Sequence, residues 1–166
     1  MAGEGTVIRR FAEGDAETVS ALIAATLRTS NRRDYTEAYL EDLILRMRRE
    51  DILRRAREQH FYVAEEAGAI VGCGSIGAFR GREDESCLFT IFVRPEAQGR
   101  GLGRGIVERL ERDPYFLRAR RIEVPASLTA VPFYLKLGYV YVNGAEPDAE
   151  RLIRMEKRRS PDAPPV

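Results

Sequence analysis

Hydrophobic residues recur every three to four positions in four stretches of the chain, a spacing that predicts amphipathic helices. The stretches are residues 15–29, a segment that follows Thr36, residues 101–112 and residues 131–137. Asp15 and Thr36 are residue types that cap the start of a helix, and Gly138 is typical of a helix end. After the second stretch, Ile52 and Leu53 continue that helix or begin another short one.

Elsewhere the apolar residues alternate with polar ones or form short continuous runs, which predicts β-strands. The predicted strands are residues 6–10, 60–66, 69–79, 86–93, 122–125, 139–142 and 152–156. Gly68 lies at the turn of a hairpin, and residues 80–85 form a charged loop. The run 86–93 is apolar on both faces, so we expect it to lie in the centre of a sheet.

This order of elements predicts an α/β protein with one mixed sheet flanked by helices. The chain has 166 residues, enough for one domain to bury its own core. No internal repeat or linker divides it, and we place a single domain at residues 1–159. We expect the proline-containing tail, residues 160–166, to be disordered.

The composition favours a soluble protein of the cytoplasm. Lys plus Arg number 27 and Asp plus Glu 26, so the net charge of +1 gives no reason to expect a nucleic acid or a membrane as partner. The first ten residues lack an apolar signal core, and no apolar run approaches the roughly 20 residues that span a bilayer. Cys73 and Cys87 both lie in apolar stretches and suggest no disulfide framework.

The segment with the clearest chemistry is a turn rich in glycine between the strand that ends at Val93 and the helix that follows. It reads Gln98-Gly99-Arg100-Gly101-Leu102-Gly103-Arg104. The first amides of a helix have no partner within the helix and point along the positive end of its dipole. Glycines allow the backbone to approach a phosphate closely, and Arg100 and Arg104 add positive charge. The segment therefore predicts a site for a phosphate-bearing ligand.

Two common phosphate loops do not fit this turn. A Walker loop ends in Gly-Lys-Ser/Thr, whereas this chain has Gly103-Arg104-Gly105. A dinucleotide fingerprint needs a third glycine at a position that Arg104 or Ile106 occupies here. The remaining alternative is a tight turn with no ligand, although glycines at a helix start reduce helix stability.

The turn resembles the Gln/Arg-x-x-Gly-x-Gly/Ala acyl-CoA motif of the GCN5-related N-acetyltransferase (GNAT) family, and Val93-Arg94-Pro95-Glu96 matches the usual end of the preceding strand. The resemblance implies the GNAT fold, a mixed and mostly antiparallel sheet of about six to seven strands flanked by about four helices. It also implies acetyl-CoA as cofactor, with CoA as product. The turn amides, from Gln98 to Arg104, would hold the pyrophosphate. The strand before the turn, Ile91, Phe92 and Val93, would offer backbone groups to the pantetheine arm and the acetyl carbonyl.

A second match lies downstream, at Phe133-Tyr134-Leu135-Lys136-Leu137-Gly138-Tyr139. It resembles the later GNAT motif with its Phe-Tyr-x-Lys-x-Gly-Phe/Tyr core. By this resemblance, Tyr134 lies near the CoA sulfur and protonates the leaving thiolate, a role that a phenol hydroxyl can serve. Family members often carry Asn at the start of this helix to contact the CoA arm. Here Ser127 and Thr129 occupy that neighbourhood, and we expect Ser127 to replace that contact.

The sequence departs from the family at the group that removes the proton from the amine. Many members use a glutamate on the central strand, and the corresponding position falls near Cys87. Glu85, two residues earlier, points to the same face and is our candidate base. A water relay to backbone carbonyls needs no acid. Cys87 could carry an acyl group as a nucleophile, but a cysteine in an apolar strand is more often inert packing.

The sequence leaves the acceptor open. The family places a wall of the acceptor site near residues 29–39, which makes Asn31 and Tyr35 candidates for substrate contact. We therefore predict an N-acetyltransferase that moves the acetyl group of acetyl-CoA, or a longer acyl group, directly to an amine of a small molecule or peptide. The alternative is a catalytically silent acyl-CoA-binding module. The family suggests a homodimer, and a single histidine, His60, predicts no metal site.

Overall fold

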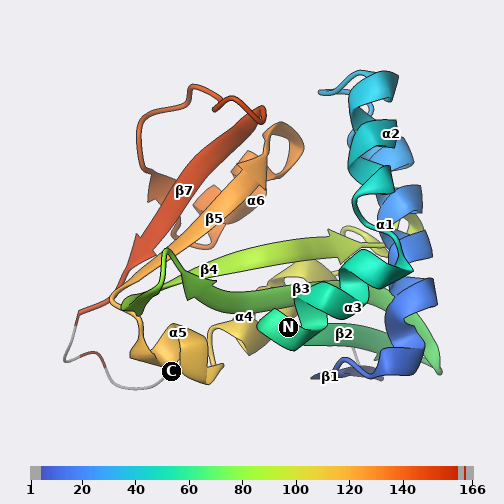
Figure 1. The fold of residues 1–166 in the computed structure, drawn as a ribbon, viewed down its shortest axis with the longest axis horizontal. Coiled ribbons are helices and arrows are strands. Elements are labelled where there is room, and N and C mark those ends of the chain that lie inside the picture. The colour runs from blue at the N-terminus through green and yellow to red at the C-terminus, as the bar shows by residue number, and fades with distance from the viewer. Residues whose placement is uncertain (1–4, 161–162, 164–166) are drawn as a thin grey trace.

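The computed structural model describes residues 5–160 and residue 163, and its centre is a sheet of seven strands in the order β1-β2-β3-β4-β5-β7-β6 (Figure 1). All neighbouring strands run antiparallel except β4 and β5, which are parallel. This confirms the predicted mixed sheet. The strands are β1 (Thr6–Arg10), β2 (His60–Glu66), β3 (Ala69–Phe79), β4 (Arg82–Val93), β5 (Arg121–Ser127), β6 (Val140–Tyr141) and β7 (Leu152–Arg158).

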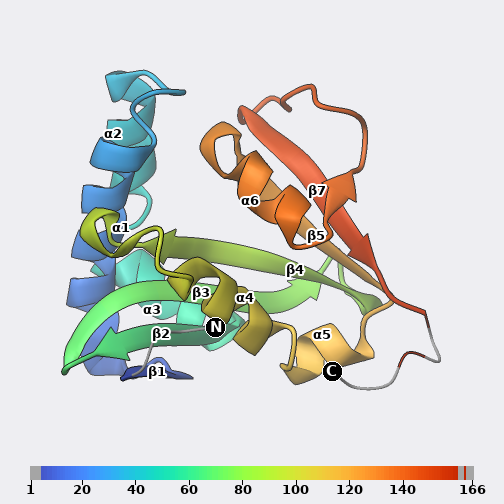
Figure 2. The ribbon, with the colours of Figure 1, turned by 180° about the vertical axis from the view of Figure 1, so that it is seen from behind.

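Six α-helices cover the sheet on both faces (Figures 1 and 2). They are α1 (Ala16–Ser30), α2 (Glu37–Leu45), α3 (Arg49–Glu58), α4 (Leu102–Leu110), α5 (Pro114–Arg118) and α6 (Val131–Lys136). The first three share a hydrophobic cluster with side chains of β2 and β3, such as Phe61 and Cys73. The last three helices share a second cluster with other residues of β2 and β3, such as Tyr62 and Ile76, whose side chains point to the opposite face of the sheet. The alternation of strand side chains therefore divides the core into two layers.

The sheet opens in its middle. Residues Glu85–Cys87 of β4 pair with Arg121–Glu123 of β5, and no further pairs join the two strands. Beyond Cys87, β4 stays with β3, while β5 continues beside β7. Figure 2 shows the resulting fork, with β4 on one arm and β5, β7 and α6 on the other.

Several boundaries differ from the sequence prediction. β4 begins at Arg82, so most of the predicted charged loop 80–85 is strand, because Arg82 pairs with Phe79 of β3 and Glu85 with Arg121 of β5. The short helix α5 was not predicted. Of the two alternatives for Ile52 and Leu53, the structure shows the second, since both lie in a separate helix, α3. Of the predicted tail, Ser160 and Ala163 are described, and the other positions lie outside the described residues.

Helix α4 lies unusually close to β3, and Gly74 allows this. A Cβ atom built on Gly74 would lie 2.6 Å from Cγ2 of Ile106 and 3.3 Å from Cδ1 of Leu110. Any larger side chain at this position must push α4 away from the sheet. Because α4 begins at the glycine turn, its position also sets the position of that turn. In the described part of the chain, no helix has the length and apolar character needed to cross a membrane.

We expect Gly74→Val to destabilise the protein by about 1–3 kcal/mol, because added methyl groups overpack the contact with Ile106. For a chain of this size, thermal denaturation should show a fall in the melting temperature of roughly 2–12 °C. Gly14→Ala is the matched control, since a Cβ atom there meets nothing within 4 Å. Equal melting temperatures for the two variants would contradict the close contact.

Candidate functional site

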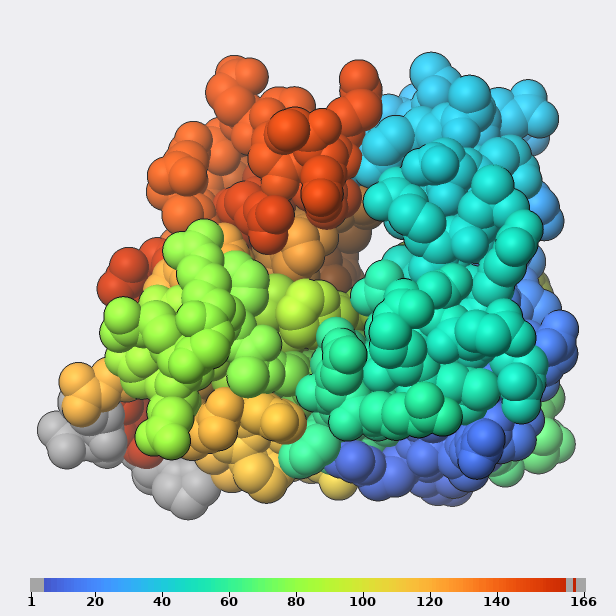
Figure 3. Space-filling model, viewed as in Figure 1, coloured from blue at the N-terminus to red at the C-terminus, as the bar shows by residue number. Residues whose placement is uncertain are grey.

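A cavity of about 850 Å³ occupies the fork between β4 and β5. Its wall on one side comes from α1, α2 and α3, and on the other from β5, α6 and the start of β7. The C-terminal half of β4 and the glycine turn complete it. Figure 3 shows the hollow between the cyan surface of α2 and the red surface around residue 150, above green β4.

The glycine turn brings a row of backbone amides to this cavity. Gly101 has φ 81° and is the N-terminal cap of α4, with no side chain to satisfy the first helical amides. Gly105 N–H bonds the Gly101 carbonyl at 3.0 Å, so the amides of residues 102–104 come before the first helical hydrogen bond. Their positive dipole end makes this a suitable place for a phosphate. A Cβ atom on Gly103 would lie 3.2 Å from the Phe133 ring, so a side chain here would crowd the turn.

The polar side chains of the turn have different tasks. Gln98 donates to Ser30 Oγ at 2.8 Å and to the Val93 carbonyl at 3.0 Å, and it thereby ties the end of β4 to α1. Arg104 lines the cavity and bonds Glu108 at 2.9 Å. Arg100 forms an ion pair with Glu66 at 2.8 Å and lies outside the residues that line the cavity. Arg104 is therefore the better placed of the two arginines to meet an anion.

A bulge in β4 lies at the centre of the cavity wall. Cys73 pairs with Phe92 and Ser75 with Phe89, so Thr90 and Ile91 face the single residue between Cys73 and Ser75. Thr90 takes φ 54°, which is rare for a β-branched residue. Strained backbone of this kind is concentrated at functional sites. The Thr90 hydroxyl is buried and has no hydrogen-bond partner among the described residues.

Tyr134 lies on α6 and lines the cavity beside the fork. Its side chain is buried, at 5% exposure, between the rings of Phe133 and Tyr139. No described residue forms a hydrogen bond with its hydroxyl, which leaves the donor available to a ligand. Burial raises the pKa of Tyr134 well above its usual value, with a smaller effect from Cys87, so the hydroxyl keeps its proton at neutral pH.

Ser127 and Thr129 stand at the start of the α6 region. Ser127 Oγ accepts a hydrogen bond from the Ala130 amide at 3.2 Å and caps the short helical turn there. The Thr129 hydroxyl donates to Asp34 at 2.7 Å. Both residues line the cavity, but each hydroxyl already serves a local contact.

Two tyrosines join the arms of the fork on the side of α1 and α2. The Tyr35 hydroxyl donates to the Arg151 carbonyl at 2.8 Å and accepts from the Leu128 amide at 2.9 Å. Tyr39 stacks on Tyr35 with ring centroids 4.8 Å apart and donates to the Glu150 carbonyl at 2.6 Å. Asn31 is 7% exposed and also lines the cavity. The two predicted acceptor residues, Asn31 and Tyr35, therefore line the same cavity as the glycine turn.

Glu85 and Cys87 lie deeper, where β4 and β5 still pair. Glu85 forms ion pairs with Arg121 at 3.6 Å and Arg82 at 3.7 Å, and it lies outside the residues that line the cavity. Cys87 is buried, at 0% exposure. Burial raises its thiol pKa, with a further rise from nearby Glu123, so the thiol is a poor nucleophile.

The structure thus brings together most of the predicted site residues. The cavity is lined by Asn31, Tyr35, Ile91, Phe92, Val93, Gln98, Gly99, Gly101, Leu102, Gly103, Arg104, Ser127 and Tyr134. Arg100 and Glu85 lie outside it. Sequence reasoning did not single out Thr90, which lies in the bulge, or Arg55 of α3, and both also line the cavity. Residues 5–160 and 163 contain no group of three His, Cys, Asp or Glu side chains that could hold a metal ion.

Comparisons with known proteins agree with this geometry. A family model described as "Acetyltransferase (GNAT) domain" matches residues 28–158. No curated protein matches the chain. Among solved structures, the paia N-acetyltransferase of Thermoplasma acidophilum, in complex with coenzyme A, is similar with a TM-score of 0.78 and 18% identity, over 93% of this chain and 99% of that one.

Two further structures have the same fold. One is a GCN5-related N-acetyltransferase, described as aminotransferase class-II, from Rhodopseudomonas palustris, with a TM-score of 0.78 and 23% identity, over 96% of this chain and 99% of that one. The other is yncA from Salmonella typhimurium, solved with its cofactor acetyl-CoA, with a TM-score of 0.65 and 18% identity, over 98% of this chain and 99% of that one.

The buried hydroxyl of Thr90 leads to a stability prediction. Thr90→Val keeps the shape of the side chain and removes a polar group that has no partner, so we expect a gain of about 1 kcal/mol. The melting temperature should rise by about 2–4 °C. Thr26→Val is the matched control, because the Thr26 hydroxyl bonds the Leu22 and Val93 carbonyls and its loss should lower the melting temperature. A loss of stability in Thr90→Val equal to that of Thr26→Val would show that the Thr90 hydroxyl has a partner.

Proposed function

The chain belongs to the GNAT acetyltransferase family, and from this premise we propose that it transfers the acetyl group of acetyl-CoA to an amine in a direct ternary complex. The observation that carries the proposal is that one cavity, in the fork between β4 and β5, is lined by both sets of residues. The glycine turn and Tyr134 are the candidates for the donor, and Asn31 and Tyr35 are the candidates for the acceptor. Donor and acceptor can therefore meet in one place without a covalent enzyme intermediate.

The residues present fit acetyl-CoA. The amides of the glycine turn and Arg104 would hold the pyrophosphate, since they offer hydrogen-bond donors and positive charge at a helix start. The free edge of β4, from Ile91 to Val93, would hold the pantetheine arm as a strand-like partner. Acetyl-CoA supplies an activated acetyl thioester. Coenzyme A and acetyl-CoA in the structures of similar fold support this assignment.

In the transfer step, the amine nitrogen forms a bond to the acetyl carbonyl carbon and the carbon–sulfur bond breaks. Amides of the β4 bulge next to Thr90 would stabilise the charge that develops on the carbonyl oxygen. Tyr134 would give its proton to the leaving thiolate, and its raised pKa keeps that proton in place beforehand.

The amine must also lose a proton. We assign this proton to water in the open cavity, because Glu85, the candidate from the sequence, is held by Arg121 and Arg82 outside the lining. A base normally contributes a factor of about 10² to 10⁴. Glu85→Gln should therefore lower kcat by less than about tenfold, and a larger fall would make Glu85 the base.

Ligand binding tests the donor site first. With acetyl-CoA at about 100 times its Kd, we expect a stabilisation of about 2.7 kcal/mol. The melting temperature should rise by roughly 5–10 °C, with a similar rise for CoA and none for NAD. An amine screen for thiol release follows. A rise without thiol release for any amine would favour the silent acyl-CoA-binding module, and no rise at millimolar acetyl-CoA would contradict the donor site.

Tyr134→Phe tests the acid. We expect kcat to fall by about 10² while the melting shift with acetyl-CoA persists, because the ring still fills its place on α6. Since burial raises the pKa of Tyr134 from 10.0, the wild-type rate should show no falling limb below pH 10. Tyr141→Phe, at an exposed position on β6, is the matched control and should change nothing. Unchanged turnover in Tyr134→Phe would remove Tyr134 from the mechanism.

A further inference from the structure

The acceptor side of the cavity has an excess of positive charge. Arg46, Arg55 and Arg154 line it, and Glu150 is the only carboxylate among the lining residues that the structure describes. Two of the three arginines have partners within the protein. Arg46 pairs with Asp42 at 2.9 Å, and Arg154 pairs with Asp148 at 2.9 Å.

Arg55 is the exception. Its Nε atom is buried without a hydrogen-bond partner, and the described part of the chain forms no ion pair or side-chain hydrogen bond with its guanidinium. Asp51, one turn earlier on α3, bonds Arg54 at 2.8 Å instead. Burial lowers the pKa of Arg55, with a further lowering from the neighbouring charge of Arg54. A half-buried arginine without a partner is costly to the folded state, which suggests that a ligand completes its contacts.

Arg55 is also close to the proposed reaction centre. The Gln59 amide donates to the Arg55 carbonyl at 2.9 Å, and the Gln59 side chain accepts from Ser75 at 2.7 Å. Ser75 in turn donates to the carbonyl of Phe89, the residue before the bulge at Thr90. These contacts join Gln59, one helical turn from Arg55, to β3 and to the residue before the bulge. Arg55 and Thr90 line the same cavity, so one small molecule can contact both.

Apolar side chains cover part of this wall. Leu40, Leu43 and Met47 of α2 and the segment that follows it line the cavity between Tyr39 and Arg55. A polyamine would place additional positive charge beside three arginines, whereas a carboxylate matches the planar fork of a guanidinium.

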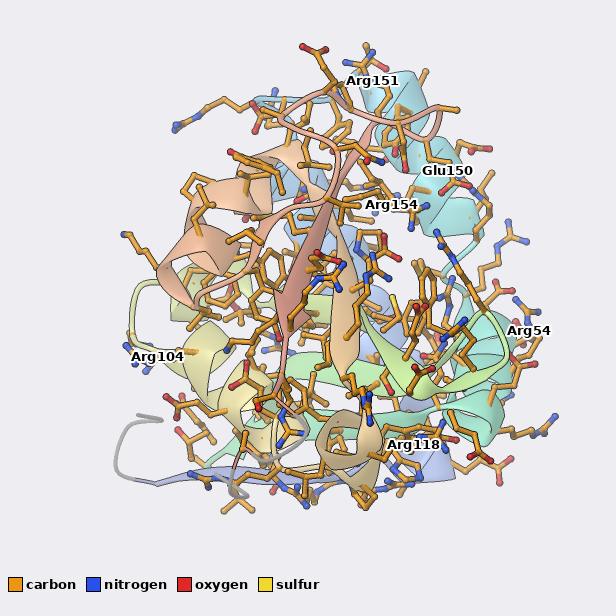
Figure 4. The ribbon with its side chains drawn as sticks, turned by 90° about the vertical axis from the view of Figure 1, so that its left-hand side faces the viewer. Arg54, Arg104, Arg118, Glu150, Arg151 and Arg154 are labelled. Carbon is orange, nitrogen blue, oxygen red and sulfur yellow. The ribbon has the colours of Figure 1, made fainter. Side chains whose placement is uncertain are left out.

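We propose that the acceptor is a small amine that also carries a carboxylate and an apolar side chain, as in an apolar amino acid, and that Arg55 binds the carboxylate. The apolar part packs on Leu43 and Met47, and the amine faces the bulge at Thr90. This inference rests on the proposed acetyl transfer and specifies its acceptor. Arg54 is the matched control position, since it is adjacent, is bonded to Asp51 and lies at the outer edge of α3 (Figure 4).

The test uses three amines that share one side chain: leucine, leucinamide and isoamylamine. Thiol release from acetyl-CoA is measured for each, with spermidine as a cationic comparison and the phosphonate analogue of leucine as a second anion. We expect kcat/KM to be about 10- to 100-fold higher for leucine than for leucinamide, in line with charged hydrogen bonds. Arg55→Gln should remove this difference, chiefly through KM, while Arg54→Gln keeps it. Arg55→Lys should restore part of it.

The outcomes are distinct. Equal or better turnover of leucinamide, or the same preference in Arg55→Gln and Arg54→Gln, would overturn the role of Arg55 and leave acetyl transfer intact. A phosphonate favoured over the carboxylate would overturn the carboxylate assignment. Thiol release with none of these amines but with another amine of the screen would overturn the acceptor alone, and thiol release with no amine at all would overturn the proposed function as well. The melting shift of Arg55→Gln with acetyl-CoA should equal that of the wild type, which shows that the variant is folded and its donor site intact.

Discussion

The short pairing between β4 and β5 is the constraint on which the cavity depends. The two parallel strands share the pairs from Glu85–Cys87 to Arg121–Glu123 and then separate. Beyond that point their facing edges have no strand partner, so their backbone groups can bind another molecule. Two local features favour the separation. The bulge at Thr90 bends β4, and Pro125 gives β5 one amide fewer to form a ladder. A longer ladder would close the sheet and remove the site.

The arms of the fork are joined again at their outer ends. Tyr35 and Tyr39, at the junction of α1 and α2, bond the backbone of residues 150 and 151, and Tyr35 also bonds Leu128. The opening is therefore a passage with a closed outer end, rather than an open groove (Figure 3). This geometry fixes the width of the passage through hydrogen bonds from aromatic side chains, which have few rotamers to lose on ordering. Because the Tyr35 hydroxyl bonds both Arg151 and Leu128, a substitution of Tyr35 would affect the acceptor wall and the segment before α6 together.

The sequence carried enough information for the sheet, the central strand and most of the cavity lining, because these depend on local spacing and on the glycine turn. Residues of the paired motifs around Gly101 and Tyr134 line one cavity. The strand alternation that suggested Glu85 could not show that Arg121 binds it across the β4–β5 pair. The start of β4 at Arg82 was hidden because charged residues on a strand end look like a loop. Helix α5 did have a signal, since Asp113 caps it and Pro114 occupies its first position.

The pair Arg54 and Arg55 shows why specificity is harder to predict than fold. In the sequence they are adjacent members of a basic run with interleaved acids, and helical spacing offers Asp51 to both. In the structure Arg54 pairs with Asp51 and faces outwards, while Arg55 lines the cavity and no described residue pairs with its guanidinium. The difference arises because neighbouring residues of a helix point in different directions, so that only Arg55 of the two lines the cavity. Binding specificity thus depends on which charge remains unpaired after folding, and this is a property of packing between elements rather than of composition.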